Sequence, residues 1–327
     1  MKPWKIALIG LGSVGRGVGK VLKGDPRFII VAAADSKSGI LDPAGIDLEA
    51  ALAMKKKTGL CGDPAWSSFR IACEADYDIL IEVTPTNVVT GEPALSTIKT
   101  ALQRSKHVVT SNKGPVALAS NELLRIAAEN KVGFLYEGTV AGSVPIIRGI
   151  QYGLAGNKIK ALYGVLNGTC NYILTRMKEE DLTYEQALSE ARDLGYAEAN
   201  PTSDVNGTDA AIKLVIIANT LLGMNVKLAD VKCTGISELT VDALKMADEN
   251  GRSIRLIATL NPEKNILEVS PRLLSQDNPL VVSGTLNAIT VETEYAGPIT
   301  FIGRGAGSIE TASAILADLL FIEEKYG

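Results

Sequence analysis

Short apolar runs alternate with amphipathic stretches over the first third of the chain. The runs cover residues 5–9, 29–34, 78–83, 107–110 and 133–136, and almost every position in them is apolar. Such runs are typical of strands that are covered on both faces of a parallel sheet. Residues 92–104 and 116–130 have the spacing of helices, and another helix is predicted to end at residue 22. The pattern predicts an α/β fold, a Rossmann-type doubly wound parallel sheet.

The hydrophobic pattern changes after about residue 137. Longer helical patterns occur at 183–194 and 206–222, and shorter segments at 253–260, 266–270 and 288–293 predict strands. Thr183 and Gln186 have capping-box spacing, and Gly195 ends that helix. The tail is glycine-rich from Gly303 and helical over 309–324. We therefore expect a second, α+β domain with a mixed sheet.

Composition and charge narrow the class of protein. The chain has 327 residues, of which 46% are hydrophobic and 21% charged, which suits a folded protein of two domains. The net charge of −4 gives no general attraction to nucleic acid or anionic lipid, so neither is expected as a partner. The first residues leave no room for a signal peptide, and no apolar run is long enough to span a bilayer. A soluble, cytoplasmic protein is expected.

His107 is the only histidine of the chain. Zinc sites built on several imidazoles are therefore excluded, and any histidine-based triad would have to use this residue. It begins a predicted buried strand, so a packing role is favoured over a catalytic one. Proton transfer is expected to fall to lysine, aspartate, glutamate, tyrosine or water.

The four cysteines are widely spaced, which favours structural thiols in a reducing compartment over disulfides or a metal site. Cys170 lies in a segment, 167–172, that is predicted to be a polar turn without an activating base. It is interpreted as a lining residue and not as a nucleophile.

A glycine-rich turn joins the first predicted strand to the first predicted helix. Its spacing is G-x-G-x-x-G: the first glycine allows a tight turn, the second lets the backbone approach a pyrophosphate, and the third lets the helix pack on the strand. Asp35 ends the second strand twenty residues after Gly15, where a carboxylate accepts hydrogen bonds from the adenosine ribose. The pattern predicts dinucleotide binding by Gly10, Gly12, Ser13, Val14, Gly15 and Asp35.

The choice between NAD and NADP stays open. Asp35 favours NAD. Lys37 and the lysine run 55–57 offer ammonium groups to a 2′-phosphate, although a solvated helix face explains the run at least as well. Use of either cofactor is expected, with Lys37 and Lys55 as candidate contacts.

Further polar residues follow the later strands and crowd one loop. Thr84 and Lys113 lie in segments that leave two strands at their carboxyl ends, where open sheets bind ligands. Residues 195–207 are predicted to be a polar loop, and Asp209 and Lys213 follow it four residues apart on one helix face. Since the rest of that helix is apolar, Lys213 is expected to be buried, and either paired or partly neutral, as suits a proton donor.

Six segments together resemble the homoserine dehydrogenase family, in the family's order and over essentially the whole chain. They are GLGSVG, TSNKGPVA, YEGTVAGSVPII, LNGTCNYIL, GYAEANPTSDVNGTDAAIK and GRGAG. The resemblance implies reversible hydride transfer between NAD(P)H and the aldehyde of L-aspartate 4-semialdehyde, which gives L-homoserine on the route to threonine and methionine. It also implies a homodimer.

The resemblance assigns roles to particular residues. Lys213 would be the catalytic acid/base and Lys113 would lie beside the nicotinamide and the reacting oxygen. The substrate would be bound by Glu198, Asp204, Asp209, Thr169 and Tyr196. Thr84 and Gly307 would close over the cofactor. A monovalent cation, sodium or potassium, would bind mostly to backbone carbonyls of Glu137, Val140, Gly142 and Val144.

The expected division is an NAD(P)-binding domain over 1–135, completed by 301–327, and a substrate-binding and dimerisation domain over 136–300. The chain ends soon after the GRGAG segment, so the regulatory ACT domain and fused aspartokinase of longer members, and threonine feedback with them, are not expected. Ala199 stands where many members have proline, which leaves Glu198 less rigidly placed.

Two alternatives stay open. One is another dehydrogenase of amino-acid metabolism, acting on aspartate or on aspartate semialdehyde; the phosphorylating type of the latter needs a cysteine nucleophile with a histidine base, for which no cysteine here has the sequence context. The other is a non-catalytic NAD-sensing protein, against which the two lysines Lys113 and Lys213 argue.

Overall fold

The computed structural model describes residues 2–327, which form two compact units. The first unit contains the chain up to Ser143 together with Gly307–Gly327, and the second is Val144–Ala306. These divisions lie a few residues after the expected ones, at 135 and 300. Each unit is described by itself.

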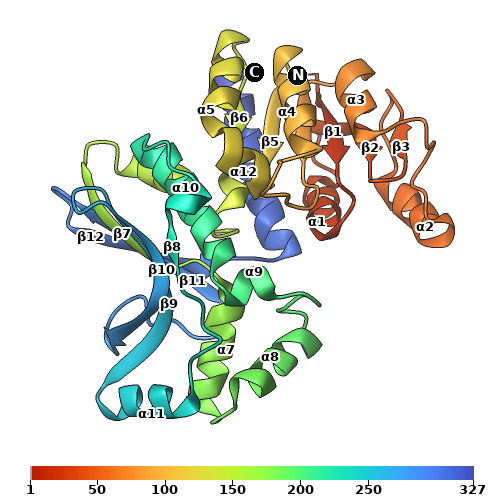
Figure 1. Ribbon diagram of the computed structural model, residues 1–327. Coiled ribbons are helices and arrows are strands. Elements are labelled where there is room, and N and C mark those ends of the chain that lie inside the picture. The colour runs from red at the N-terminus through yellow and green to blue at the C-terminus, as the bar shows by residue number, and fades with distance from the viewer. Residues whose placement is uncertain (1) are drawn as a thin grey trace. The chain divides into compact units, whose positions relative to one another are not determined.

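The first unit is built on a six-stranded sheet in the order β3-β2-β1-β4-β5-β6 (Figure 1). All neighbouring strands are parallel except β2 and β3, which are antiparallel. The chain winds from β1 to one side and returns to the other side at β4, which confirms the predicted doubly wound sheet. The strands are β1 (Trp4–Ile9), β2 (Phe28–Ala34), β3 (Gly39–Leu41), β4 (Ile79–Glu82), β5 (His107–Thr110) and β6 (Phe134–Leu135).

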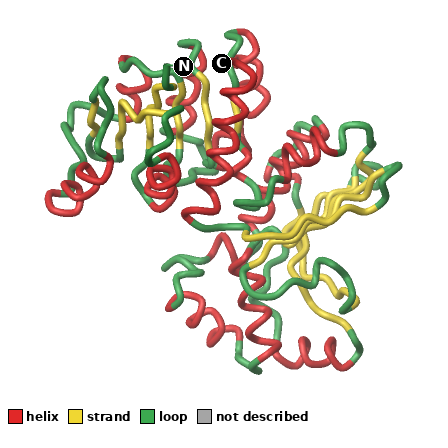
Figure 2. The backbone as a smooth tube through the Cα atoms, turned by 180° about the vertical axis from the view of Figure 1, so that it is seen from behind, coloured by secondary structure: helices red, strands yellow, loops and turns green. Residues whose placement is uncertain are grey.

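Helices cover this sheet, and the last of them comes from the end of the chain. The C-terminal helix packs beside the first helix, and both contribute buried apolar side chains to a core with Ile6 and Leu8 of β1. The expected return of the C-terminal segment to the first sheet is thus seen in the structure (Figure 2). The helices are α1 (Ser13–Leu22), α2 (Leu48–Thr58), α3 (Ser68–Glu74), α4 (Ala94–Gln103), α5 (Lys113–Glu129), the short 3-10 turn η1 (Glu137–Thr139) and α12 (Ser308–Tyr326).

The second unit contains a mixed six-stranded sheet in the order β12-β11-β7-β9-β10-β8. Its neighbours are antiparallel except β10 and β8, which are parallel. The mixed sheet confirms the predicted α+β character, but three of its strands (β7, β8 and β12) were hidden in the sequence because they are short, interrupted by glycine or largely exposed. The strands are β7 (Ile159–Val165), β8 (Lys232–Cys233), β9 (Arg252–Asn261), β10 (Ile266–Ser275), β11 (Leu286–Thr293) and β12 (Pro298–Arg304).

The helices of the second unit include one that the sequence pattern concealed. The polar turn expected at 167–172 is wrong: Asn167 caps a helix by accepting a hydrogen bond from Cys170 N, so these polar residues form the first turn of α7. The predicted loop 195–207 contains the short helix α9. The elements are α6 (Ile146–Arg148), the π-helical turn η2 (Gly149–Gly153), α7 (Gly168–Glu179), α8 (Tyr184–Asp193), α9 (Thr202–Val205), α10 (Thr208–Leu222), η3 (Leu228–Asp230) and α11 (Val241–Glu249).

Two of these helices pack on the sheet of their own unit. α10 contacts β9 and β10, and α7 contacts β9 and β11. The predicted capping box at Thr183 and Gln186 is present at the start of α8. Among residues 2–327, no helix is both long and apolar enough to cross a bilayer.

Candidate functional site

The glycine turn between β1 and α1 has two glycines held by packing and one that faces open space. A Cβ atom on Gly10 would lie 2.6 Å from the carbonyl oxygen of Val83, and one on Gly15 would lie 1.9 Å from that of Gly10. A Cβ atom on Gly12 would meet nothing within 4 Å. Gly12 also precedes the N-terminus of α1, where backbone N–H groups attract anions. The turn therefore fits a dinucleotide pyrophosphate, with Gly12 as the glycine that leaves it room.

The glycine-rich tail meets this turn within the first unit. Ser308 Oγ donates a hydrogen bond to the carbonyl oxygen of Ser13, at 2.5 Å. Gly307 has a φ of 138°, in the region that favours glycine, and a Cβ atom there would lie 2.0 Å from a carboxylate oxygen of Glu310. Val14 is half-buried against the apolar core. The segment of Gly307 and Ser308 thus lies against the glycine turn at Ser13.

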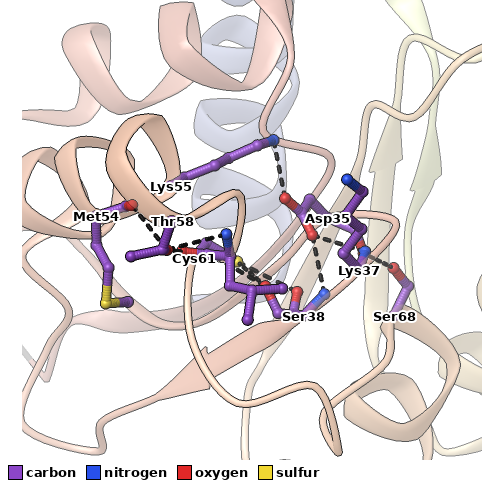
Figure 3. A network of polar contacts seen from close by, with 9 residues as sticks. Asp35, Lys37, Ser38, Met54, Lys55, Thr58, Cys61 and Ser68 are labelled. Atoms are coloured by element: carbon purple, nitrogen blue, oxygen red, sulfur yellow. Dashed lines mark hydrogen bonds and ion pairs between the residues drawn. The ribbon is translucent and has the colours of Figure 1, made fainter.

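Asp35, at the end of β2, is held by backbone and by a lysine (Figure 3). Its Oδ1 accepts hydrogen bonds from the backbone N–H groups of Lys37 and Ser38, at 2.8 and 2.9 Å. Lys55 reaches Oδ2 from α2, with Nζ at 2.9 Å. Burial acts to raise the pKa of Asp35, but the Lys55 ammonium and the two N–H donors outweigh it and hold that pKa below its ordinary value. Lys55 is therefore a partner of Asp35, whereas Lys56 and Lys57 are exposed.

The segments after β4 and β5 are tied to each other. Asn112 Oδ1 caps α5 by accepting from Gly114 N, and its Nδ2 donates to Thr84 Oγ1 at 3.3 Å. Lys113 is the first residue of α5 and is half-buried, so the loop expected at this position is the start of a helix. Thr84 and Lys113 therefore lie on two segments that hydrogen bonds of the Asn112 side chain join.

Lys213 lies in a polar cluster inside the second unit. The lysine is only 8% exposed. Its Nζ lies 2.7 Å from Asp209 Oδ2 and donates to the carbonyl oxygen of Leu166 at 2.6 Å. Asn167 Nδ2 donates to Asp204 Oδ1 at 2.7 Å and to Asp209 Oδ2 at 2.9 Å. The structure confirms that Lys213 is buried and paired, and it adds Asn167 as the residue that joins the two carboxylates.

Of the other predicted substrate residues, Thr169 and Tyr196 contact each other, and Glu198 stands apart from them. Thr169 Oγ1 donates to the carbonyl oxygen of Tyr196 at 2.7 Å, and the ring of Tyr196 lies 4.9 Å from that of Tyr172. Glu198 is exposed, and none of the hydrogen bonds or ion pairs among residues 2–327 includes it. The structure therefore does not bring Glu198 into the cluster around Lys213.

His107 and Cys170 have structural surroundings. His107 Nδ1 accepts a hydrogen bond from Gly133 N at 2.9 Å, and its ring packs against Trp4 and Tyr326. Cys170 is fully buried, and burial raises its pKa well above the ordinary value, which keeps the thiol protonated. Neither is arranged as a catalyst, in agreement with the sequence interpretation.

The expected cation ligands are mostly backbone groups. Glu137, Val140 and Gly142 are buried in the first unit, whereas Val144 belongs to the second. Glu137 N donates to Asp318 Oδ2 at 3.0 Å. No group of three or more His, Cys, Asp or Glu among residues 2–327 could hold a metal ion. Carboxylate and carbonyl oxygens, the donor types expected here, suit a hard cation.

Two residues that sequence reasoning missed hold these networks together. Asn167 carried a signal, since Asn three residues before Cys170 has helix-capping spacing. Glu82, whose Oε1 accepts a hydrogen bond from Thr84 N at 2.9 Å, carried another, since it is the only charged residue of the apolar strand β4.

Comparisons with known proteins agree with this geometry. A family model described as "Homoserine dehydrogenase" matches residues 145–320, and one described as "Homoserine dehydrogenase, NAD binding domain" matches residues 10–137. The chain is 44% identical to the homoserine dehydrogenase of Methanocaldococcus jannaschii, covering 97% of this chain and 98% of that one. It is 40% identical to the NAD(+)-dependent homoserine dehydrogenase of Pseudomonas canavaninivorans, covering 99% and 97%.

A solved structure supports the same grouping. The crystal structure of a putative homoserine dehydrogenase from Archaeoglobus fulgidus superposes with a TM-score of 0.90 at 46% identity, covering 99% of this chain and all of that one. The matches span both units, the glycine turn and the cluster around Lys213. The chain belongs to the homoserine dehydrogenase family, whose members are NAD(P)-dependent oxidoreductases that act on a CH–OH group.

Proposed function

We propose that the chain catalyses the reversible NAD(P)-dependent reduction of L-aspartate 4-semialdehyde to L-homoserine, a step toward threonine and methionine. The observation that carries the proposal is the buried Lys213, whose ammonium is held by Asp209 and by the carbonyl oxygen of Leu166, beside two carboxylates that Asn167 joins. Membership of the family supports the same reaction.

Lys213 is the proposed acid. When bound, the nicotinamide supplies or takes up the hydride. As the aldehyde carbon receives the hydride, negative charge develops on the carbonyl oxygen, and Lys213 Nζ transfers a proton to it. In the oxidation direction the same nitrogen takes the proton back, so oxidation is favoured under alkaline conditions. Lys113, on the cofactor-binding unit, is the second proposed catalytic residue.

The carboxylates of the second unit are proposed to recognise the substrate ammonium. Asp204 and Asp209 already lie together on Asn167, which holds their charge in one place. Thr169 and Tyr196 complete the proposed substrate set, and Glu198 is proposed to join them when substrate binds. The second unit would thus be the substrate-binding and dimerisation domain.

The first unit is proposed to bind the cofactor. Gly12 provides the open backbone for the pyrophosphate, and Asp35 with Lys55 faces the adenosine ribose. Because a carboxylate favours ribose hydroxyls and an ammonium favours a 2′-phosphate, this pair suits the use of both NAD and NADP. The full proposed set is Gly10, Gly12, Ser13, Val14, Gly15, Asp35, Lys37, Lys55, Thr84, Lys113 and Gly307.

A bound sodium or potassium ion, a homodimer and a cytoplasmic location complete the proposal. The cation is assigned to carbonyl oxygens of Glu137, Val140, Gly142 and Val144; turnover in sodium, potassium and choline salts of equal ionic strength checks this. The four free thiols support a reducing compartment. Sedimentation of the purified chain measures the oligomeric state.

The test is the absorbance of reduced cofactor formed from L-homoserine with NAD or NADP at alkaline pH. Lys213→Ala should lower kcat by about a thousandfold, a typical loss of a general acid, with little change in cofactor binding. Lys232→Ala, an exposed lysine of the same unit, is the matched control and should retain full activity. No turnover by the unaltered chain with either cofactor would rule out the proposal.

A further inference from the structure

Glu82 is a fully buried acid for which the reaction has no use. Its exposed fraction is 0%, at the carboxyl end of β4, between β1 and β5. None of the ion pairs among residues 2–327 includes it. A buried carboxylate without a cation is costly, so Glu82 needs hydrogen bonds or a proton.

The hydrogen atoms around Glu82 can be counted. Thr84 N donates to Oε1 at 2.9 Å, and Thr84 Oγ1 donates to the same oxygen. Thr110 Oγ1 lies 2.8 Å from the backbone carbonyl oxygen of Glu82 and 3.1 Å from its Oε2. This hydroxyl has one hydrogen, which the nearer carbonyl receives. With a proton on the carboxyl group, Oε2 donates it to Thr110 Oγ1, so that this 3.1 Å contact is also a hydrogen bond.

The surroundings of Glu82 favour the same protonation state. Burial raises the pKa of Glu82, and its polar contacts with Thr84, Thr110 and Asn112 act in the opposite direction without cancelling this effect. Thr110 Oγ1 also accepts from Asn112 N at 3.0 Å, so every polar atom in the network has a partner when Glu82 is neutral.

From this one carboxyl group the network reaches both segments that carry proposed cofactor residues. Through Oε1 it fixes Thr84 directly. Through Thr110 and Asn112 it fixes the cap of α5, whose first residue is Lys113. The glycine turn packs on the same segment, since a Cβ atom on Gly10 would lie 2.9 Å from Thr84 N.

We propose that Glu82 is a neutral carboxylic acid that acts as a positioning residue, holding the segments after β4 and β5 in the arrangement that binds the cofactor. The proposal rests on the proposed function only in that the cofactor is a nicotinamide dinucleotide. A neutral acid donates one hydrogen bond and accepts at its other oxygen, and glutamine has the same pattern. An ionised glutamate only accepts, and glutamine could not replace it without loss.

The experiment measures binding of NADH and NADPH by fluorescence, without substrate, so that it stands apart from turnover. Glu82→Gln should bind both within threefold of the unaltered chain. Glu82→Leu should weaken binding at least tenfold, with kcat at saturating cofactor changed much less than the cofactor KM. The carbonyl stretch of a protonated carboxyl group should be present in the infrared difference spectrum between the unaltered chain and Glu82→Gln at neutral pH.

Thr110→Val provides a second test in case Glu82→Leu does not fold. This substitution removes only the hydroxyl that faces Oε2 of Glu82. It should weaken cofactor binding about tenfold, and Glu74→Gln, an exposed glutamate of the same unit, should have no effect. The proposal is overturned if Glu82→Gln fails to fold or loses cofactor, if Thr110→Val binds normally, or if the protonated-carboxyl band is absent. A chain that binds cofactor but does not oxidise homoserine would instead overturn the proposed function.

Discussion

Asn167 shows how much one side chain decides at the scale of residues. Its amide oxygen caps α7, and its amide nitrogen holds Asp204 and Asp209, the second of which pairs with Lys213. Without an amide donor, two carboxylates would face each other beside the lysine, and their repulsion would move them apart. The residue therefore links the stability of a helix to the position of the proposed acid.

Asn167→Ser separates these two roles. Serine is as good a helix cap as asparagine, so the free energy of unfolding should change by less than about 1 kcal/mol. The hydroxyl cannot bridge both carboxylates, so kcat at saturating substrates should fall about a hundredfold, as a misplacement of about 1 Å does. Steady-state kinetics and urea unfolding of the same preparation measure both quantities.

Asn167→Ala is the matched comparison. Alanine also removes the helix cap, so the free energy of unfolding of this variant should be about 1 kcal/mol lower than that of the serine variant. The kcat values of the two variants should be similar. A serine variant with kcat close to that of the unaltered chain would mean that the amide does not position the carboxylates.

At the scale of elements, the structure explains an ambiguity in the lysine run. The run ends α2, where ammonium groups also interact favourably with the helix dipole, which explains the two exposed lysines. Lys55 reaches the end of β2 and pairs with Asp35 (Figure 3), whereas Lys56 and Lys57 are exposed. Helical rotation thus selects one lysine of three for the proposed ribose site.

Lys55→Ala should lower the ratio of kcat/KM for NADP to that for NAD by about tenfold or more, the effect of losing one charged hydrogen bond to a phosphate. The freed Asp35 carboxylate would then repel a 2′-phosphate and still accept from ribose hydroxyls. Lys57→Ala, on the same turn but exposed, should leave the ratio unchanged. An equal effect of both substitutions would point to general electrostatics instead of a contact.

At the scale of the whole molecule, His107 ties together distant parts of the first unit. It accepts from Gly133 N and packs between Trp4 of β1 and Tyr326 of α12. Burial lowers its pKa to about 4, with Lys106 adding to this and Asp78 opposing it. Protonation would place a charge in this packed site and remove the acceptor that Gly133 needs.

The stability of the first unit should therefore fall in mild acid. Above the ordinary histidine pKa of about 6.5, the imidazole is neutral in both the folded and the unfolded state, and His107 makes its full contribution to the free energy of unfolding. As the pH falls from about 6.5 to about 4, His107 becomes protonated in the unfolded chain but stays neutral in the folded chain, so the unfolded state is favoured. The loss is on the order of 3 kcal/mol, from the difference between the ordinary pKa and about 4.

The check compares urea unfolding of the unaltered chain and His107→Asn at pH 7 and pH 4.5. Tryptophan fluorescence reports on the unfolding of the first unit, because both tryptophans, Trp4 and Trp66, lie in that unit. The unaltered chain should lose more stability than the variant, and the variant should retain activity at neutral pH. Equal losses in both chains would show that His107 titrates normally.

Local patterns in the sequence determined much of this protein. The apolar runs, the glycine spacing and the capping box depend on neighbours a few residues apart, and they predicted the doubly wound sheet, the dinucleotide turn and the Asp209–Lys213 pair. The resemblance added the family and the reaction.

Tertiary structure alone decided the contacts between distant segments. Asn167 reaches Asp204 across 37 residues and Thr110 reaches Glu82 across 28, so neither contact leaves a periodic trace in the chain. The edge strand β12 is half-exposed and glycine-containing, and only pairing with β11 makes it a strand. Because a buried polar group must find its partner in the folded chain, the sequence could supply the groups of the site but not the hydrogen bonds that join them.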